Sequence, residues 1–239
     1  TDPWRDPITG AYQYSATKGR NYTHEEYFNE VLVASPTNPT DGVFNGTMTI
    51  DTSKNFYWNA TQNVQSTTLP GTLPPSTDDY VMFNASTNVM QISGQIKVAG
   101  DLNITGKGND RTINYSGRGC FLAYNNVTID SDLVTCNGGN PANTANSFPV
   151  NNCIGIMAYD TLTVGATAHC DIMGAFYGQN KVVSAKQTNV MGTFVGNYFD
   201  MGTNVPSIVQ VPSLVNNMPP GMPGDKNYFT LTLKGWRER

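Results

Sequence analysis

The sequence predicts an all-β chain whose strands are wound into a β-solenoid, with a short N-terminal helix and long loops. Charged residues make up only 13% of the 239 residues, about half their share in an average globular protein. The chain lacks the Glu-, Lys-, Ala- and Leu-rich runs that are typical of coiled coils and long helical bundles. A short phrase of turn residues and alternating apolar residues recurs along it instead, and this repeat is the main argument for stacked coils.

The repeated phrase joins a small or apolar stretch to a turn of Gly, Asn or Asp, which an apolar–polar–apolar alternation follows. Residues 120–129 align with residues 155–164, so that Ala123 matches Ala158, and residues 175–183 form a weaker copy in which Tyr177 is matched to Ala158, 19 residues earlier. Shorter copies occupy residues 45–50 and 99–104. The alternation places every second side chain on one face of a strand, and one coil of about 20 residues cannot bury that face alone. Successive coils are therefore expected to stack, and a β-sandwich with repeated hairpins is the alternative fold.

The pattern divides the chain into three segments. Within the first, Thr23 and Glu26 have capping-box spacing and an apolar stripe comes after them, which predicts a short helix over residues 23–33 at the open end of the stack. In the last, a Pro- and Gly-rich loop precedes an alternating run at residues 228–233, which predicts a final strand. The predicted boundaries are residues 1–39 for the N-terminal segment, 40–212 for the β-solenoid, and 213–239 for the loop and C-terminal strand.

The four cysteines are spaced too widely for a typical zinc site, which brings ligands in close pairs. They are Cys120, Cys136, Cys153 and Cys170. An even number of cysteines in a chain rich in Asn and Thr favours disulfides and an extracytoplasmic location. Three connectivities are open, of which the bridge Cys136–Cys153 is favoured because it would close one loop. Four buried free thiols in a cytosolic protein are the alternative.

The charge and the histidine content exclude several classes of function. The net charge is −4 at pH 7 and the chain has two histidines, which disfavours bulk nucleic-acid binding and leaves little material for His-rich metal sites. No apolar run reaches the 18 or so residues that span a bilayer, so we expect no membrane contact in this chain. We also expect no metal and no cofactor.

A catalytic site of the kind found in polysaccharide-cleaving solenoids would need carboxylates clustered on one face, often with a basic residue nearby. Asp130 and Asp132 are two residues apart and so lie on the same side of an extended strand, with Arg111 and Arg118 not far away in the sequence. Paired carboxylates at a turn are more often solvated loop residues. The sequence therefore predicts a protein that is not an enzyme.

Aromatic residues at equivalent repeat positions suggest a binding edge. Tyr124 and Tyr159 occupy the same position in two copies of the phrase, with Phe176 or Tyr177 in the next copy. If these rings are exposed in a row, they could stack on flat sugar faces. The alternative is that they fill corners of the core.

Basic residues also cluster in the sequence and would form a positive strip if the coils stack. The strip would consist of Lys97, Lys107, Arg111 and Arg118, with Lys181 and Lys186 on a later coil. Such a strip could bind DNA in spite of the acidic total, because local potential steers a polyanion. Asp101 and Asp110 lie among these residues, so a mixed solvated face is the alternative.

Several phrases resemble PilX-type proteins associated with type IV pili. They are residues 113–119 before the strand at 127–129, residues 174–177, residues 192–198, residues 206–212 before the Pro219-Pro220-Gly221 loop, and the ending at residues 233–238. The resemblance implies a minor pilin whose head is a right-handed β-solenoid at or near the pilus tip. Tapirins, which are cellulose-binding β-helix proteins, are a second similar group. The long apolar N-terminal helix of minor pilins is not among these residues.

Together, these observations predict an extracellular display or adhesion module of a type IV pilus that acts by surface recognition. Its partners would be other pilus subunits and a surface or polysaccharide ligand. A carbohydrate-binding surface protein and a DNA receptor at the pilus tip are the alternative functions.

Overall fold

The computed structural model describes residues 14–15, 19–21, 42–106, 111–135, 148–202, 204–220 and 222. Every regular element in these residues is a β-strand, apart from the short 3-10 helix η3 (Pro212–Asn216), and the predicted all-β class is therefore confirmed. The helix expected over residues 23–33 and the strand expected over residues 228–233 lie outside the described residues. Among the described residues, no helix has the length and apolar character that spanning a membrane requires.

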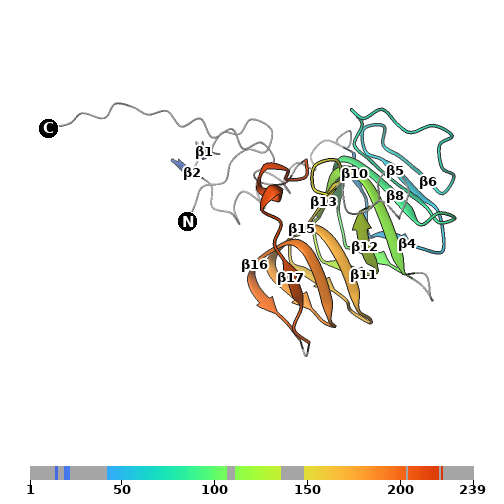
Figure 1. Cartoon of the computed structure of the whole chain (residues 1–239). Helices are drawn as coiled ribbons and strands as arrows, with labels where there is room; N and C mark the ends of the chain where they lie inside the picture. Colours follow the sequence, from blue (N-terminus) through green and yellow to red (C-terminus); the bar gives the residue numbers. More distant parts are fainter. Residues whose placement is uncertain are drawn as a thin grey trace.

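Fifteen strands form one large mixed sheet, and β1 (Tyr14–Ser15) pairs separately with β2 (Arg20–Asn21). Figure 1 shows the later strands lying side by side in a stack that ends with β16 and β17. The strands of the large sheet are β3 (Val43–Phe44), β4 (Met48–Asp51), β5 (Phe56–Asn59), β6 (Val64–Ser66), β7 (Tyr80–Asn84), β8 (Val89–Val98), β9 (Leu102–Thr105), β10 (Thr112–Ala123), β11 (Val127–Asp130), β12 (Asp132–Thr135), β13 (Cys153–Ala158), β14 (Thr161–Val164), β15 (Cys170–Ser184), β16 (Thr188–Asp200) and β17 (Ser207–Val209).

Most of these strands pair in parallel, in three columns that share a buried core. Column one consists of β4, β9, β11, β14 and the last residues of β15 and β16. One core position runs through it in register: Met48, Leu102, Val127, Leu162, Val182 and Phe199. The first five of these side chains are almost completely buried. The apolar alternation of each repeat thus forms one continuous ladder.

The other two columns share their long strands. Column two joins the ends of β8 and β10 to β13 and to the middle of β15 and β16, with a core ladder of Ile96, Phe121, Ile156, Phe176 and Phe194. Column three joins the starts of β8, β10, β15 and β16 with β12 and β17. The chain passes from column three to column two at glycines: Gly192 has φ +144°, and a Cβ there would lie 1.8 Å from the carbonyl oxygen of Gly174. Only glycine allows β15 and β16 to approach so closely at this point.

The predicted repeat alignment is confirmed in register. Ala123 pairs with Ala158 in column two, and Val127 pairs with Leu162 in column one. The weaker copy is displaced by one residue from the predicted alignment, because Met157 rather than Ala158 pairs with Tyr177. The prediction was wrong there because it matched a small residue to an aromatic one, whereas the strands align their outward and inward faces.

Strands β5, β6 and β7 pair antiparallel, unlike the rest of the sheet. β7 pairs with β8, β5 pairs with β7, and β6 pairs with β5, so a hairpin-like extension covers one edge of the first long strand. The large sheet extends from Val43 to Val209.

Candidate functional site

A C-terminal segment lies across the outward face of column two, and we call its described residues 211–220 and 222 the strap. Its apolar side chains form a second hydrophobic cluster outside the main core. The members of this cluster on the strands are Cys120, Leu122, Cys153, Met157, Ala175 and Tyr177, and those on the strap are Val211, Leu214, Met218 and Met222. Leu214 is 4% exposed, and full burial of a leucine side chain stabilises a fold by about 1.5–3 kcal/mol.

The outward ladder of column two explains where the strap lies. In register, it reads Lys97, Leu122, Met157, Tyr177 and Val195. The three central side chains are buried beneath the strap, whereas Val195 on the last coil is 51% exposed. Gly155 provides the space for Met222, because a Cβ at that glycine would lie 2.3 Å from the methionine sulfur.

Arg118 holds the strap against the strands. Its Nη1 donates hydrogen bonds to the carbonyl oxygens of Pro149 and Val150, at 2.6 and 2.9 Å. Its Nη2 donates to the carbonyl oxygens of Asn217 and Met218, at 3.1 and 2.8 Å. Hydrogen bonds from a charged donor are stronger than neutral ones, so this one side chain joins β10, the residues before β13, and the strap.

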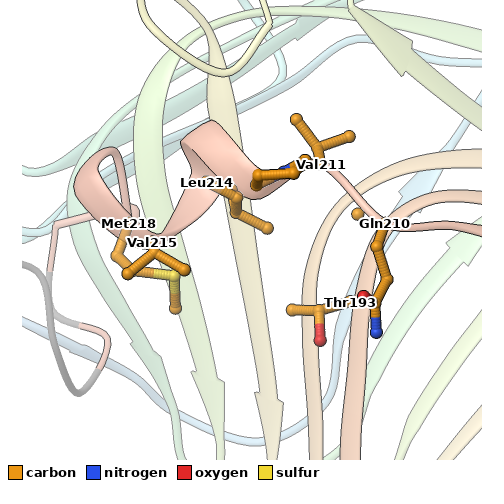
Figure 2. Close-up of a pocket in the computed structure, with 8 residues that line it drawn as sticks. Thr193, Gln210, Val211, Leu214, Val215 and Met218 are labelled. Carbon is orange, nitrogen blue, oxygen red and sulfur yellow. The ribbon is translucent and has the colours of Figure 1, made fainter.

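An apolar groove of about 220 Å³ lies between the strap and the last coil. Figure 2 shows Leu214, Val215 and Met218 on the strap side, with Thr193 of β16 and Gln210 on the other. Val211, Pro212 and Gly192 complete the lining. Val215 is 58% exposed. The groove therefore offers apolar contact with two uncharged polar side chains at one wall.

A second hollow, of about 470 Å³ and lined in part by charged side chains, lies on the other side of the strap, near β7 and β8. Its lining includes Asp79, Tyr80, Ser93, Arg118 and Pro220. Burial raises the pKa of the Asp79 carboxyl, although the hydrogen bond that it accepts from the backbone N–H of Gln95, at 3.2 Å, and the charge of Lys97 act in the opposite direction. A convergent set of polar groups of this kind can bind a polar ligand.

The predicted aromatic edge is only partly present. Tyr159 is 38% exposed and follows Tyr124 by one coil, since its N–H donates to the carbonyl oxygen of Ala123 at 3.0 Å. Burial raises the pKa of Tyr124. The prediction was wrong for Phe176, which is fully buried and packs against Phe194 in the core. It was also wrong for Tyr177, which is 7% exposed because the strap covers it.

The predicted basic strip is divided among separate contacts. Arg111 pairs with Asp130 at 3.1 Å, Lys181 pairs with Asp200 at 2.8 Å, and Arg118 donates to backbone carbonyl oxygens. Lys97 is half-buried on the outward face of β8, Lys186 is exposed, and Lys107 lies outside the described residues. These ion pairs and carbonyl contacts leave less positive charge for a polyanion than the sequence suggested.

The two candidate carboxylates form structural contacts between coils. Asp130 accepts hydrogen bonds from the N–H groups of Thr167 and Ala168, at 3.0 and 3.4 Å, and from the Thr167 hydroxyl. Burial alone would raise the pKa of Asp130, but these hydrogen bonds and the Arg111 guanidinium together lower it. Asp132 accepts from the N–H of Asp171 at 2.9 Å and from the Thr112 hydroxyl at 3.1 Å. Both carboxylates therefore have defined hydrogen-bond partners, whereas the sequence indicated solvated loop residues.

The disulfide prediction fails for two of the cysteines. Cys153 and Cys170 are free thiols, which excludes the favoured bridge Cys136–Cys153, and burial raises the pKa of each to about 12. Cys153 lies in the cluster under the strap and Cys170 in the main core, so both pack as small apolar residues. The buried Cys120 thiol donates to the carbonyl oxygen of Phe121 at 3.3 Å. Cys136 lies outside the described residues.

The sequence predicted a loop after residue 212, with residues 215–226 among the loops that could supply specificity, but it did not predict that this loop packs on column two. Leu214, Met218 and Met222 recur at intervals of four in a loop that is otherwise rich in Pro and Asn, and this periodicity was the available signal. In the described part of the chain, no three His, Cys, Asp or Glu side chains gather in a way that could hold a metal. No protein family, no curated protein and no solved structure matches the chain.

Proposed function

We propose that the three columns are the walls of a right-handed β-solenoid, and that the chain is the extracellular head of a type IV pilus minor pilin that acts as a non-enzymatic display and adhesion module. The in-register ladders support the solenoid, since each coil covers the core of the preceding one. Side chains at one corner add contacts between coils: Asn126 donates its N–H to Asp101 at 3.1 Å, and Asn180 donates to Asp160 at 2.9 Å. The pilus phrases in the sequence support the family.

One observation carries the recognition role: exposed apolar side chains are concentrated on β16, on β17 and at the start of the strap. Among the described residues, thirteen large hydrophobic side chains are exposed, and nine of them lie between residues 191 and 215. These nine are Met191, Val195, Tyr198, Phe199, Met201, Val205, Ile208, Val209 and Val215. Monomeric proteins rarely expose a large contiguous apolar patch unless it binds a partner. The rigid strands would hold these side chains in a fixed arrangement for contact with a partner.

Adhesion through the groove can be tested with the purified chain and beads that carry phenyl groups. We expect retention on the beads, and we expect Val215→Ser to weaken it, because Val215 lines the groove. Val64→Ser is the matched control, because Val64 is 43% exposed on the distant strand β6. Equal retention of the two variants would contradict a role for the groove.

The pilus assignment needs a separate experiment. Antibodies raised against the purified chain should label filaments in electron micrographs of cells that carry the gene. Cells without the gene are the control. Labelling that stays on the cell body and leaves the filaments bare would contradict the assignment.

Polysaccharide binding is the second candidate, and the exposed ring of Tyr159 beside Tyr124 favours it. Retention on insoluble cellulose should fall for Tyr159→Ala, since a flat sugar face packs on an exposed ring. Tyr198→Ala is the matched control, because Tyr198 is 61% exposed on the last coil. DNA binding has less support than either, because the Arg111 and Lys181 cations are paired with carboxylates.

A further inference from the structure

Sulfur atoms are concentrated in the hydrophobic cluster beneath the strap. Among the described residues, five of the twelve side chains in this cluster carry sulfur, against four of the thirty-four in the main core. The five are Cys120 on β10, Cys153 and Met157 on β13, and Met218 and Met222 on the strap. The two cysteines and Met157 are 0% exposed, and Met222 is 4% exposed. Three segments that are far apart in the sequence thus bring thiols and thioethers together.

Gly155 lies at the centre of these sulfur groups. It pairs in register with Cys120, and a Cβ at Gly155 would lie 3.2 Å from the Cys120 sulfur and 2.3 Å from the Met222 sulfur. Cys153 and Met157 come two residues before and two residues after Gly155 on β13, so their side chains are on the same outward face. Because Gly155 has no side chain, the Met222 sulfur reaches the backbone of β13 between them.

This set of donors suits a soft monovalent cation. Thiolate and thioether sulfur are ligands of soft ions such as Cu⁺, whereas zinc sites use Cys, His and carboxylate ligands. Two cysteine thiolates and Cu⁺ together carry one negative charge, and Arg118, which pairs in register with Cys153, supplies one positive charge beside them. The site as a whole is then neutral, whereas a divalent ion would leave it with one positive charge.

An entry path borders the cluster. The hollow of about 470 Å³ near β7 and β8 is lined by Arg118 and Pro220, which are each two residues from a sulfur-bearing residue, Cys120 and Met222. The strap is held by the hydrogen bonds of Arg118 and by apolar packing rather than by strand pairing. Segments of this kind open locally at a lower free-energy cost than core strands. An ion from solution can therefore reach the sulfur atoms without disturbing the stack.

We propose that Cys120, Cys153 and Met222 bind one Cu⁺ ion beneath the strap, with Met157 and Met218 as the neighbouring thioethers that can complete its coordination. Each thiol releases its proton to solvent when the ion binds, and the ion then joins the strap to β10 and β13. The sequence predicted no metal, because the spacing of the cysteines does not show that distant thioethers join them. This inference goes beyond the adhesion role and does not depend on it.

The test is a titration of the reduced full chain with Cu⁺ in the absence of oxygen, in competition with a coloured Cu⁺ chelator. We expect one ion per chain. Met222→Leu preserves the packing, and it and Cys153→Ala should each weaken Cu⁺ binding about tenfold or more. Met90→Leu and Cys170→Ala make the same substitutions in the main core and should bind Cu⁺ like the wild type. A wild-type chain that does not bind Cu⁺, or four variants that bind it equally, would overturn the proposal.

Cleavage of the strap gives a second readout that does not depend on the variants. A protease of broad specificity should cut the strap more slowly with one equivalent of Cu⁺ than without it, because the ion joins Met222 to β10 and β13. Zn²⁺ at the same concentration is the control ion and should leave the cleavage rate unchanged, since thioethers are not zinc ligands. Equal protection by the two ions, or Cu⁺ binding that leaves the cleavage rate unchanged, would show that the proposed site is wrong.

Discussion

Each end of the stack contains a group of contacting aromatic rings, but the rings differ in how far they are exposed. At the first end, the Phe44 ring lies 6.0 Å from Phe56 and 5.4 Å from Trp58. At the last end, the Phe194 ring lies 5.5 Å from Phe176 and 5.7 Å from Phe199. Phe44, Phe56 and Trp58 are at most 6% exposed, whereas Phe199 is 37% exposed. Ring contacts alone therefore do not close an end.

The difference lies in the strands that continue the sheet beyond each aromatic group. At the first end, β7, β5 and β6 continue the sheet antiparallel from the first residues of β8. At the last end, β17 pairs with three residues of β16, and the chain then continues into the strap. A parallel stack cannot complete its own final coil, so each end requires a separate device.

The largest effect should come from removing one ring at each end. Phe44→Ala should lower the free energy of unfolding by about 3–5 kcal/mol, because it leaves a cavity in a covered site. Phe199→Ala should cost about 1–2 kcal/mol in the monomer, because water already reaches that ring. Urea unfolding of both variants measures this contrast. Equal losses in a chain shown to be monomeric would mean that the last end is covered as well as the first.

The backbone at the two ends offers a second contrast. Gly192→Ala should destabilise the fold by about 2–3 kcal/mol, because the residue has φ +144° and the new Cβ would meet the carbonyl oxygen of Gly174. Gly46→Ala, at φ +83° with no atom near the added Cβ, should cost about 1 kcal/mol. Urea midpoints of the two variants test this order. The reverse order would argue against close contact between β15 and β16.

The parallel pairing of the repeated phrases could be predicted from the sequence, because register is a local property of short phrases. The alternation around Val127 and Leu162 and the Ala123–Ala158 match indicated which residues would be neighbours. The repeat pattern does not predict which segment covers the outward face of the strands. Tyr177 alternates like an exposed residue, but it is buried by a strap that comes more than thirty residues later in the sequence.

The contacts of the candidate site could not be predicted from the sequence for a related reason. Arg118 belongs to a basic cluster in the sequence, but its partners are four backbone carbonyls up to 100 positions away. A carbonyl has no sequence signature, so the clustering of basic residues suggested DNA binding, whereas Arg118 anchors the strap in the structure. The cysteines show the same limitation: Cys153 is buried by the distant strap, and the even number of cysteines made a disulfide seem favourable.

Releasing the strap should have a smaller and more local effect than changes at either end. Arg118→Met keeps the length of the side chain but removes the donors to Asn217 and Met218, and should cost about 1–2 kcal/mol. Limited proteolysis should then cut the strap faster than in the wild type. Lys186→Met, which removes an exposed cation, is the control and should behave like the wild type. An unchanged cleavage rate for Arg118→Met would show that apolar packing alone holds the strap.

The smallest effect should be a difference in pH dependence between the two ends. Burial raises the pKa of Asp79 near the first end from 3.8, so its ionised form destabilises the fold at neutral pH, and this penalty fades as the pH falls through the raised pKa. The hydrogen bond from Lys181 lowers the pKa of Asp200 at the last end, so its contribution is complete above 3.8 and is lost only as the pH falls through the lowered pKa.

Asp79→Asn and Asp200→Asn separate the two carboxyls when urea midpoints are measured between neutral pH and pH 4. Relative to the wild type, Asp79→Asn should gain stability at neutral pH, and the gain should shrink steadily toward pH 4 because the wild-type carboxyl becomes protonated. The difference between Asp200→Asn and the wild type should stay flat over the same range. A flat profile for Asp79→Asn would mean that water reaches this carboxyl freely, and the hollow near the first end would then be as open as the last coil.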